Sequence, residues 1–214
     1  MAQAFIGGIR RVLSAPALLA AVAAASLLSP LYPTVASRRL LFEFVLVGSF
    51  LLGGAIDRYA RARPTRAVGF FGACGRHLAA MLRLAAIEVL LYLAADNVPD
   101  VRAALAIALV VNLVCVYARV RLVVEDRRSA FGALLSSARF VRRNPGAIVV
   151  HAVWAAAILA TAFSLRGAAP ILLLPLYGSA TVFFQSRLAH AGYAAAPPVE
   201  WPESPAAEAL SNRR

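Results

Sequence analysis

Six long apolar stretches divide the chain, and they alternate with connections that carry most of its polar residues. Each stretch is close to the roughly 17–25 residues that an α-helix needs to cross the hydrocarbon core of a bilayer. We therefore predict an all-α, polytopic transmembrane bundle of about six spans within residues 1–192. The predicted spans are Val12–Leu31, Leu40–Tyr59, Leu78–Ala95, Val101–Tyr117, Gly146–Leu165 and Ala168–Leu188.

The composition agrees with a membrane environment. Hydrophobic residues make up 61% of the 214 residues, charged residues make up only 15%, and the mean hydropathy is +0.74. A soluble domain typically carries about 25% charged residues. A water-soluble fold of this chain would therefore lack the polar residues needed to cover its apolar surface.

The charges are arranged by side of the membrane. All 22 basic residues are arginine, and the formal net charge is +12. They lie between the apolar runs and not on one face of a soluble scaffold, which argues against nucleic-acid binding. With a cytoplasmic N-terminus, 17 arginines fall inside and 4 outside, and Arg83 lies within a span. This asymmetry predicts a multi-pass protein of the bacterial inner (cytoplasmic) membrane with both termini in the cytoplasm.

The two ends of the chain have separate interpretations. Arg10 and Arg11 precede an apolar stretch and residues 23–25 resemble a cleavage site, so a cleaved secretory signal is an alternative to the first span. Cleavage would leave five spans in the same orientation. Residues 193–214 are rich in alanine, proline and glutamate without periodicity, which predicts a disordered cytoplasmic tail.

An amphipathic helix is predicted in the connection between the fourth and fifth spans. Apolar residues recur there at helical spacing, and arginines supply the polar side. Such a helix would lie in the membrane interface on the cytoplasmic side, with its arginines against anionic lipid headgroups. The alternative is an ordinary solvated connector. The apolar residues are Phe131, Leu134, Leu135, Ala138 and Val141, and the candidate anionic-lipid contacts are Arg127, Arg128, Arg139, Arg142 and Arg143.

Two cytoplasmic connections resemble each other. The pattern Tyr-Ala-Arg-Xaa-Arg occurs at residues 59–63 and again at residues 117–121. These matches suggest a parallel repeat over residues 40–95 and 101–165, in which each copy is a span, a basic interfacial helix and a second span. Further matches in register pair Ala67, Gly69 and Arg76 with Ala130, Gly132 and Arg139.

Two runs carry a resemblance to known families. Residues 53–60 (Gly-Gly-Ala-Ile-Asp-Arg-Tyr-Ala) and residues 118–130 (Ala-Arg-Val-Arg-Leu-Val-Val-Glu-Asp-Arg-Arg-Ser-Ala) resemble a family of uncharacterised bacterial six-span integral membrane proteins. More remotely, the acidic pair followed by Ser129 and a basic amphipathic helix is similar to the membrane domain fused to some glycerophosphodiester phosphodiesterases. This second resemblance covers only residues 117–146. It implies a membrane bundle and no chemistry, because the catalytic domain has no counterpart here.

Ionisable residues inside the predicted spans are candidates for function, because burying them in hydrocarbon is costly. The three candidate intramembrane residues are Glu43, Arg83 and Glu88. Glu43 lies about one turn inside the outer end of its span, where its side chain can either snorkel or pair with Arg39, and Arg83 has a side chain long enough to snorkel to the interface. Glu88, near the middle of the third span, has two open interpretations: a proton or cation site, or a structural partner of a neighbouring helix.

Other polar and small residues indicate packing more than chemistry. Asn112 predicts an interhelical hydrogen bond, and the spacing of Ser49 and Gly53 predicts close helix packing. Cys74 and His77 share a helical face, but a metal site needs three or four converging ligands. The phosphate-binding loop, the nucleophile elbow and the dinucleotide fingerprint are missing from the sequence. We therefore predict no catalytic, cofactor-binding or metal residues.

Two functions follow as expectations. The interfacial arginines and the short soluble loops favour a non-enzymatic accessory, assembly or lipid-organising component of the bacterial inner membrane. Its expected partners are the bilayer, anionic headgroups and either another membrane protein or further copies of the chain. The intramembrane carboxylate favours the alternative, a small oligomeric transporter or channel with Glu88 in its pathway.

Overall fold

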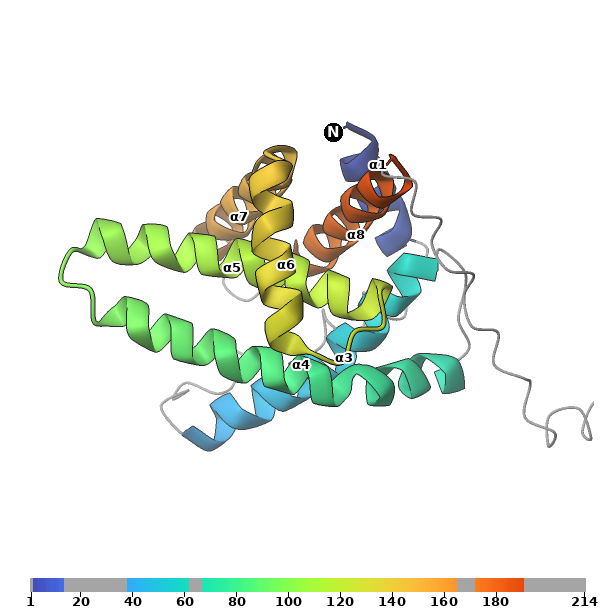
Figure 1. The fold of residues 1–214 in the computed structure, drawn as a ribbon, viewed down its shortest axis with the longest axis horizontal. Helices are drawn as coiled ribbons and strands as arrows, with labels where there is room; N and C mark the ends of the chain where they lie inside the picture. The colour runs from blue at the N-terminus through green and yellow to red at the C-terminus, as the bar shows by residue number, and fades with distance from the viewer. Residues whose placement is uncertain (1, 14–37, 62–66, 165–171, 191–214) are drawn as a thin grey trace, which may run out of the picture.

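The computed structural model describes residues 2–13, 38–61, 67–164 and 172–190, and this part of the chain is helical apart from short turns (Figure 1). The prediction of an all-α protein is confirmed for these residues. The tail at 193–214 and most of the first predicted span lie outside them. The helices are α1 (Ala2–Leu13), α3 (Arg38–Arg61), α4 (Ala67–Asp96), α5 (Val101–Val124), α6 (Ala130–Arg143), α7 (Gly146–Ser164) and α8 (Leu173–His190).

Helices α4 and α5 form a long antiparallel hairpin (Figure 1). Its turn ends at Asp100, whose side chain caps α5 by accepting a hydrogen bond of 3.0 Å from the backbone N–H of Arg102. Two described helices are long and apolar enough to cross a membrane, over Val68–Asp96 and Val101–Val124. A shorter apolar segment, Gly146–Ile158, lies in α7.

Both helices of the hairpin extend beyond the predicted spans. Helix α4 begins at Ala67 instead of Leu78, and α5 ends at Val124 instead of Tyr117. Neither extension contains a proline, or a serine, threonine, aspartate or asparagine that would cap and so end the helix. The two similar connections consequently fold differently: residues 67–76 form the start of α4, whereas their counterparts at 130–139 form the separate helix α6. The proposed repeat itself stays a prediction.

Helix α6 crosses the hairpin, packing against α5 and also touching α4 (Figure 1). The hydroxyl of Ser129 begins it by accepting a hydrogen bond of 3.2 Å from the N–H of Gly132. The face that α6 buries against the protein shares only Val141 with the predicted apolar face. Small residues lie inward because they allow close approach to α5, and the larger Phe131 and Leu135 are left exposed. The buried residues are Ala130, Ala133, Ser137 and Val141.

The largest cluster of buried side chains lies where α1, α3, α5 and α8 meet. Tyr117 of α5 and Phe184 of α8 are fully buried there, and Phe140 of α6 packs edge-to-face on Phe184 with ring centres 5.1 Å apart. Helices α1 and α8 approach so closely that a methyl group at Gly178 would lie 2.9 Å from the carbonyl oxygen of Gly8. Glycine is therefore required at this crossing.

The predicted close packing at Gly53 is confirmed. A methyl group there would lie 3.2 Å from Cβ of His77 on α4. The next residue, Gly54, faces Cys74 and Phe70 at still shorter range. These two glycines bring α3 against the first half of α4, and so fix one side of the hairpin.

Candidate functional site

A buried ion pair joins the two helices of the hairpin. Nη2 of Arg119 on α5 donates to Oε2 of Glu88 on α4. Nη1 of the same arginine donates to the hydroxyl of Tyr177 on α8, at 2.5 Å. The side chain of Glu88 is 9% exposed and that of Arg119 is 17% exposed. One guanidinium therefore connects three helices inside the protein.

A second polar contact continues this line toward the hairpin turn. Nδ2 of Asn112 donates to the hydroxyl of Tyr92 at 3.0 Å, so the predicted interhelical bond of Asn112 is confirmed. Residues 88 and 92 are one turn apart on α4, and 112 and 119 are two turns apart on α5, so each pair lies on one helix face. We call Glu88, Tyr92, Asn112, Arg119 and Tyr177 the polar ladder.

The polar ladder is electrically balanced. A buried charge is tolerated when an opposite charge and additional hydrogen bonds compensate its lost hydration, and Glu88 and Arg119 compensate each other in this way. The arrangement offers a fixed pair of charges and aligned hydroxyl groups, in place of an isolated carboxylate. The structure therefore places Glu88 in a pairing between helices, and its role in moving protons or cations stays a prediction.

The pairing of Arg119 with Glu88 was not predicted from the sequence. Arg119 was assigned to the cytoplasmic connection, because the predicted fourth span ended at Tyr117. The signal that was available is the run of apolar residues after Arg119, where Val120, Leu122 and Val123 are all buried. These residues extend the apolar helix past the arginine and place it within α5.

A second charged cluster links α3, α4 and the turn after α5. Asp57 forms an ion pair of 3.0 Å with Arg61. The buried ring of His77 lies between two carboxylates, with Nε2 3.9 Å from Asp57 and Nδ1 3.9 Å from Asp126. Among the described residues, no three histidine, cysteine or acidic side chains are grouped so that they could hold a metal ion. Through the ring of His77, the cluster brings polar side chains of three elements close together.

The three predicted intramembrane residues are not brought together. Glu43 lies in α3, and its side chain is outside the described part of the structure. Arg83 and Glu88 share α4 but face different ways, since Glu88 is buried and Arg83 is exposed. Nη1 of Arg83 makes a long contact of 3.5 Å with the backbone oxygen of Arg128, at the start of α6.

The five predicted lipid-contacting arginines are all exposed. One of them, Arg127, donates to Glu125, which also accepts 2.9 Å hydrogen bonds from Arg121. The other four have no ion pair with any residue in the described part of the chain. They present unneutralised positive charge along and beside α6. These four are Arg128, Arg139, Arg142 and Arg143.

A further arginine has a structural position that the sequence analysis did not assign. Nη1 of Arg11, near the end of α1, donates to the carbonyl oxygen of Tyr59 and, at 2.9 Å, to Oε1 of Gln185. Nε2 of Gln185 in turn donates to the carbonyl oxygen of Ala60 at 2.8 Å. Burial lowers the pKa of the Arg11 guanidinium, which nevertheless stays charged. These bonds join the ends of α1, α3 and α8.

Three groups of polar residues are thus available for function: the polar ladder, the cluster around His77, and the exposed arginines of α6. The polar ladder is satisfied by contacts within the protein, and the exposed arginines face outward. In the second group, Nε2 of the buried His77 has no hydrogen-bond partner among the described residues. In comparisons with known proteins, no family model, no curated protein and no solved structure matches the chain.

Proposed function

We propose that the chain is a six-span protein of the bacterial inner membrane, with both termini in the cytoplasm, that acts as a non-enzymatic lipid-organising or assembly component. One observation carries this proposal. An amphipathic helix with exposed arginines, α6, lies across a hairpin of two apolar helices of membrane-spanning length.

The exposed apolar side chains of the hairpin support the proposal that a lipid bilayer surrounds it. Leu90 is 65% exposed, Leu105 is 61% exposed and Val110 is 59% exposed. In water such side chains would form an apolar patch of the kind that marks an interaction surface. In a bilayer they would contact lipid tails, while the polar ladder stays inside the protein.

The angle of α6 supports an interfacial position. If α4 and α5 stand along the membrane normal, a helix that crosses them lies along the membrane surface. Its exposed Phe131 and Leu135 then face the acyl region and its arginines reach anionic headgroups. The positive-inside rule places this surface in the cytoplasm.

The topology is tested with single cysteines. In a background where Cys74 and Cys115 are alanine, we propose the substitutions Asn97→Cys in the hairpin turn and Arg128→Cys beside α6. A membrane-impermeant maleimide should label the first variant in intact spheroplasts. It should label the second only after the membrane is permeabilised. Labelling with the opposite sidedness would contradict the orientation.

The lipid function is tested by changing Arg139, Arg142 and Arg143 together to glutamine, with the same three positions changed to lysine as the matched control. Each basic residue near an anionic surface contributes about 1 kcal/mol, or roughly five-fold in binding. We expect the ratio of anionic to zwitterionic lipid that co-purifies in native lipid discs to fall in the glutamine variant and to hold in the lysine variant. An unchanged ratio in both variants would contradict the proposal.

The polar ladder supports a second candidate function, a small oligomeric transporter or channel with Glu88 in its pathway. The supporting observation is that a carboxylate and a guanidinium are buried together at the junction of α4, α5 and α8. Proton-coupled flux into liposomes that is abolished by Glu88→Gln would favour this function. Flux no greater than in protein-free liposomes would contradict it.

A further inference from the structure

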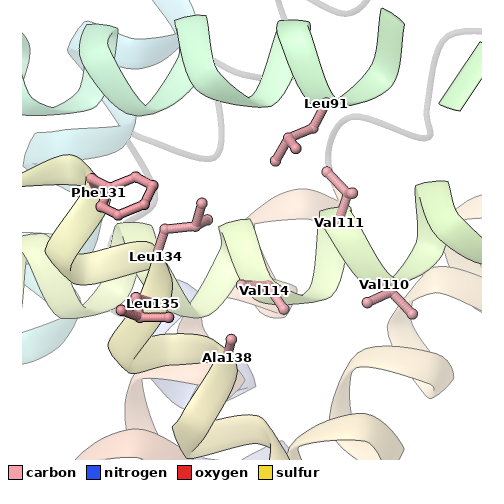
Figure 2. Close-up of a pocket in the computed structure, with 8 residues that line it drawn as sticks. All are labelled: Leu91, Val110, Val111, Val114, Phe131, Leu134, Leu135 and Ala138. Carbon is pink, nitrogen blue, oxygen red and sulfur yellow. The ribbon is translucent and has the colours of Figure 1, made fainter. Parts of the chain in front are cut away.

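An apolar groove lies between the hairpin and α6 (Figure 2). Its volume is about 230 Å³, which is below the roughly 300–1,000 Å³ of pockets that take a drug-sized ligand. All of its lining side chains are hydrocarbon. They include Leu91 from α4, Val110, Val111 and Val114 from α5, and Phe131 and Leu135 from α6.

The groove results from the way α6 packs. Small residues bring α6 onto α5, and the larger side chains on its adjacent face stand beside the hairpin without filling the space. Phe131 is 69% exposed and Leu135 is 46% exposed. Ala138 lies one turn along α6 from Leu134 and completes this side of the groove. No described segment of the chain covers these side chains.

Positive charge lies beside the groove at its Phe131 end. Arg128 lies in the connection just before α6, three residues before Phe131, and Nη1 of Arg83 lies 3.5 Å from its backbone oxygen. Both guanidinium groups are exposed, and neither has a carboxylate partner among the described residues. The site therefore combines a narrow hydrocarbon surface with two cations, Arg83 from α4 and Arg128 from the connection between α5 and α6.

We propose that this groove holds one acyl chain of an anionic phospholipid, whose phosphate group is bound by Arg83 and Arg128. The inference rests on the proposed membrane location. In that setting a bound lipid stands parallel to α4 and α5, with its headgroup at the level of α6. Its chain then runs past Leu91 and Val111 toward the hairpin turn. The charge of the two arginines selects the anionic headgroup, and the hydrocarbon lining selects the chain.

Photocrosslinking in lipid discs tests the proposal. The probes are phosphatidylglycerol and phosphatidylcholine that carry the same photoreactive group on one acyl chain, and mass spectrometry locates the labelled peptides. We expect phosphatidylglycerol to label the groove residues of α5 and α6 more strongly than phosphatidylcholine does. Arg83→Gln and Arg128→Gln should each lower the phosphatidylglycerol labelling by about five-fold. Equal labelling by the two probes would overturn the proposal.

Two matched controls separate groove occupancy from general damage. Ala138→Phe fills the groove from an exposed position and should remove labelling by both probes, whereas Ala152→Phe, on an exposed position of α7, should not. Arg102→Gln, exposed at the hairpin turn, should leave labelling unchanged. Groove labelling that survives Ala138→Phe would overturn the proposal, provided that circular dichroism shows each variant to be folded.

The same discs distinguish this inference from the broader proposal. Anionic lipid enrichment that depends on Arg139, Arg142 and Arg143, without selective labelling of the groove, would overturn the groove site and leave the lipid-organising function standing. If the enrichment did not depend on these arginines and the groove were not labelled selectively, the groove site and the lipid-organising function would both be overturned. A protein that is released from membranes by alkaline carbonate would contradict the membrane location on which each of them depends.

Discussion

The two halves of the α4–α5 hairpin have similar apolar compositions but opposite surroundings. In the half near α6, Leu84, Ala118 and Leu122 are fully buried by other parts of the protein. In the half near the turn, Leu90, Leu93 and Leu105 are between 54% and 65% exposed. The polar ladder crosses from the half near α6, which holds Glu88 and Arg119, into the half near the turn, which holds Tyr92 and Asn112.

This contrast shows which part of the hairpin depends on protein contacts and which depends on its solvent. The half near α6 is covered by neighbouring helices, and so it can bury a carboxylate and a guanidinium beside each other. We call it the covered half. The half near the turn, which we call the exposed half, has apolar side chains and no covering helix among the described residues. Its stability therefore depends on whether it is surrounded by water or by hydrocarbon.

The largest expected effect comes from breaking the ion pair in the covered half. Arg119→Met leaves the charge of Glu88 buried without a partner, and we expect it to reduce the free energy of unfolding by about 3–5 kcal/mol. The double variant with Glu88→Met and Arg119→Met removes both charges and should be close to the parent protein. Thermal unfolding in lipid discs measures the stability of the single and the double variant relative to the parent protein. Equal losses in the single and double variants would contradict a stabilising pair.

The next effect tests the solvent of the exposed half with two matched changes on α5. Val110→Asp places a charge in the middle of the helix, and we expect it to cost about 2.5–3.5 kcal/mol if the site faces hydrocarbon. Val101→Asp places the same charge at the hairpin turn, where an exposed substitution costs no more than about 0.5 kcal/mol. Membrane integration and thermal unfolding of the two variants should differ accordingly. Equal behaviour would indicate that both positions face water.

A smaller effect is expected where α3 covers α4. A methyl group at Gly54 would lie 2.9 Å from the ring of Phe70 and 3.0 Å from its backbone oxygen. Gly54→Ala should therefore destabilise the protein by about 1–3 kcal/mol. Gly72→Ala on α4 has open space around it and should be neutral or stabilising by up to about 1 kcal/mol. A stabilising effect of Gly54→Ala would show that α3 does not pack as described.

The sequence was sufficient to predict the helical class and the approximate positions of most described helices. Hydropathy and helical periodicity are local properties, and they identified both arms of the hairpin and the amphipathic character of α6. Helix ends were less well predicted. Because Arg119 interrupts an apolar run, a hydropathy window ended the fourth span before it, although the helix continues to Val124.

Contacts between helices were harder to predict than the helices themselves. Nothing near Glu88 in sequence indicates that Arg119 and Tyr177 face it, because these residues lie on other helices. The contacts of α6 with the rest of the protein were not predicted, because the sequence indicated only which residues would face the membrane interface. Close approach to α5 favours small residues such as Ala133 and Ser137. The structure supplies this pairing information, and the charges of α6 and the carboxylate of Glu88 were already visible in the sequence.

The smallest expected effect concerns the outer contact of the polar ladder, between Asn112 and Tyr92. Interhelical hydrogen bonds in membrane proteins contribute on average about 0.6 kcal/mol, because the separated helices find other partners. A double-mutant cycle with Asn112→Ala and Tyr92→Phe should give a coupling free energy of that size. The same cycle on Glu88 and Arg119 should give a clearly larger value. Equal coupling free energies in the two cycles would indicate that Glu88 and Arg119 are no better shielded than Asn112 and Tyr92. The covered half of the hairpin would then end before Glu88.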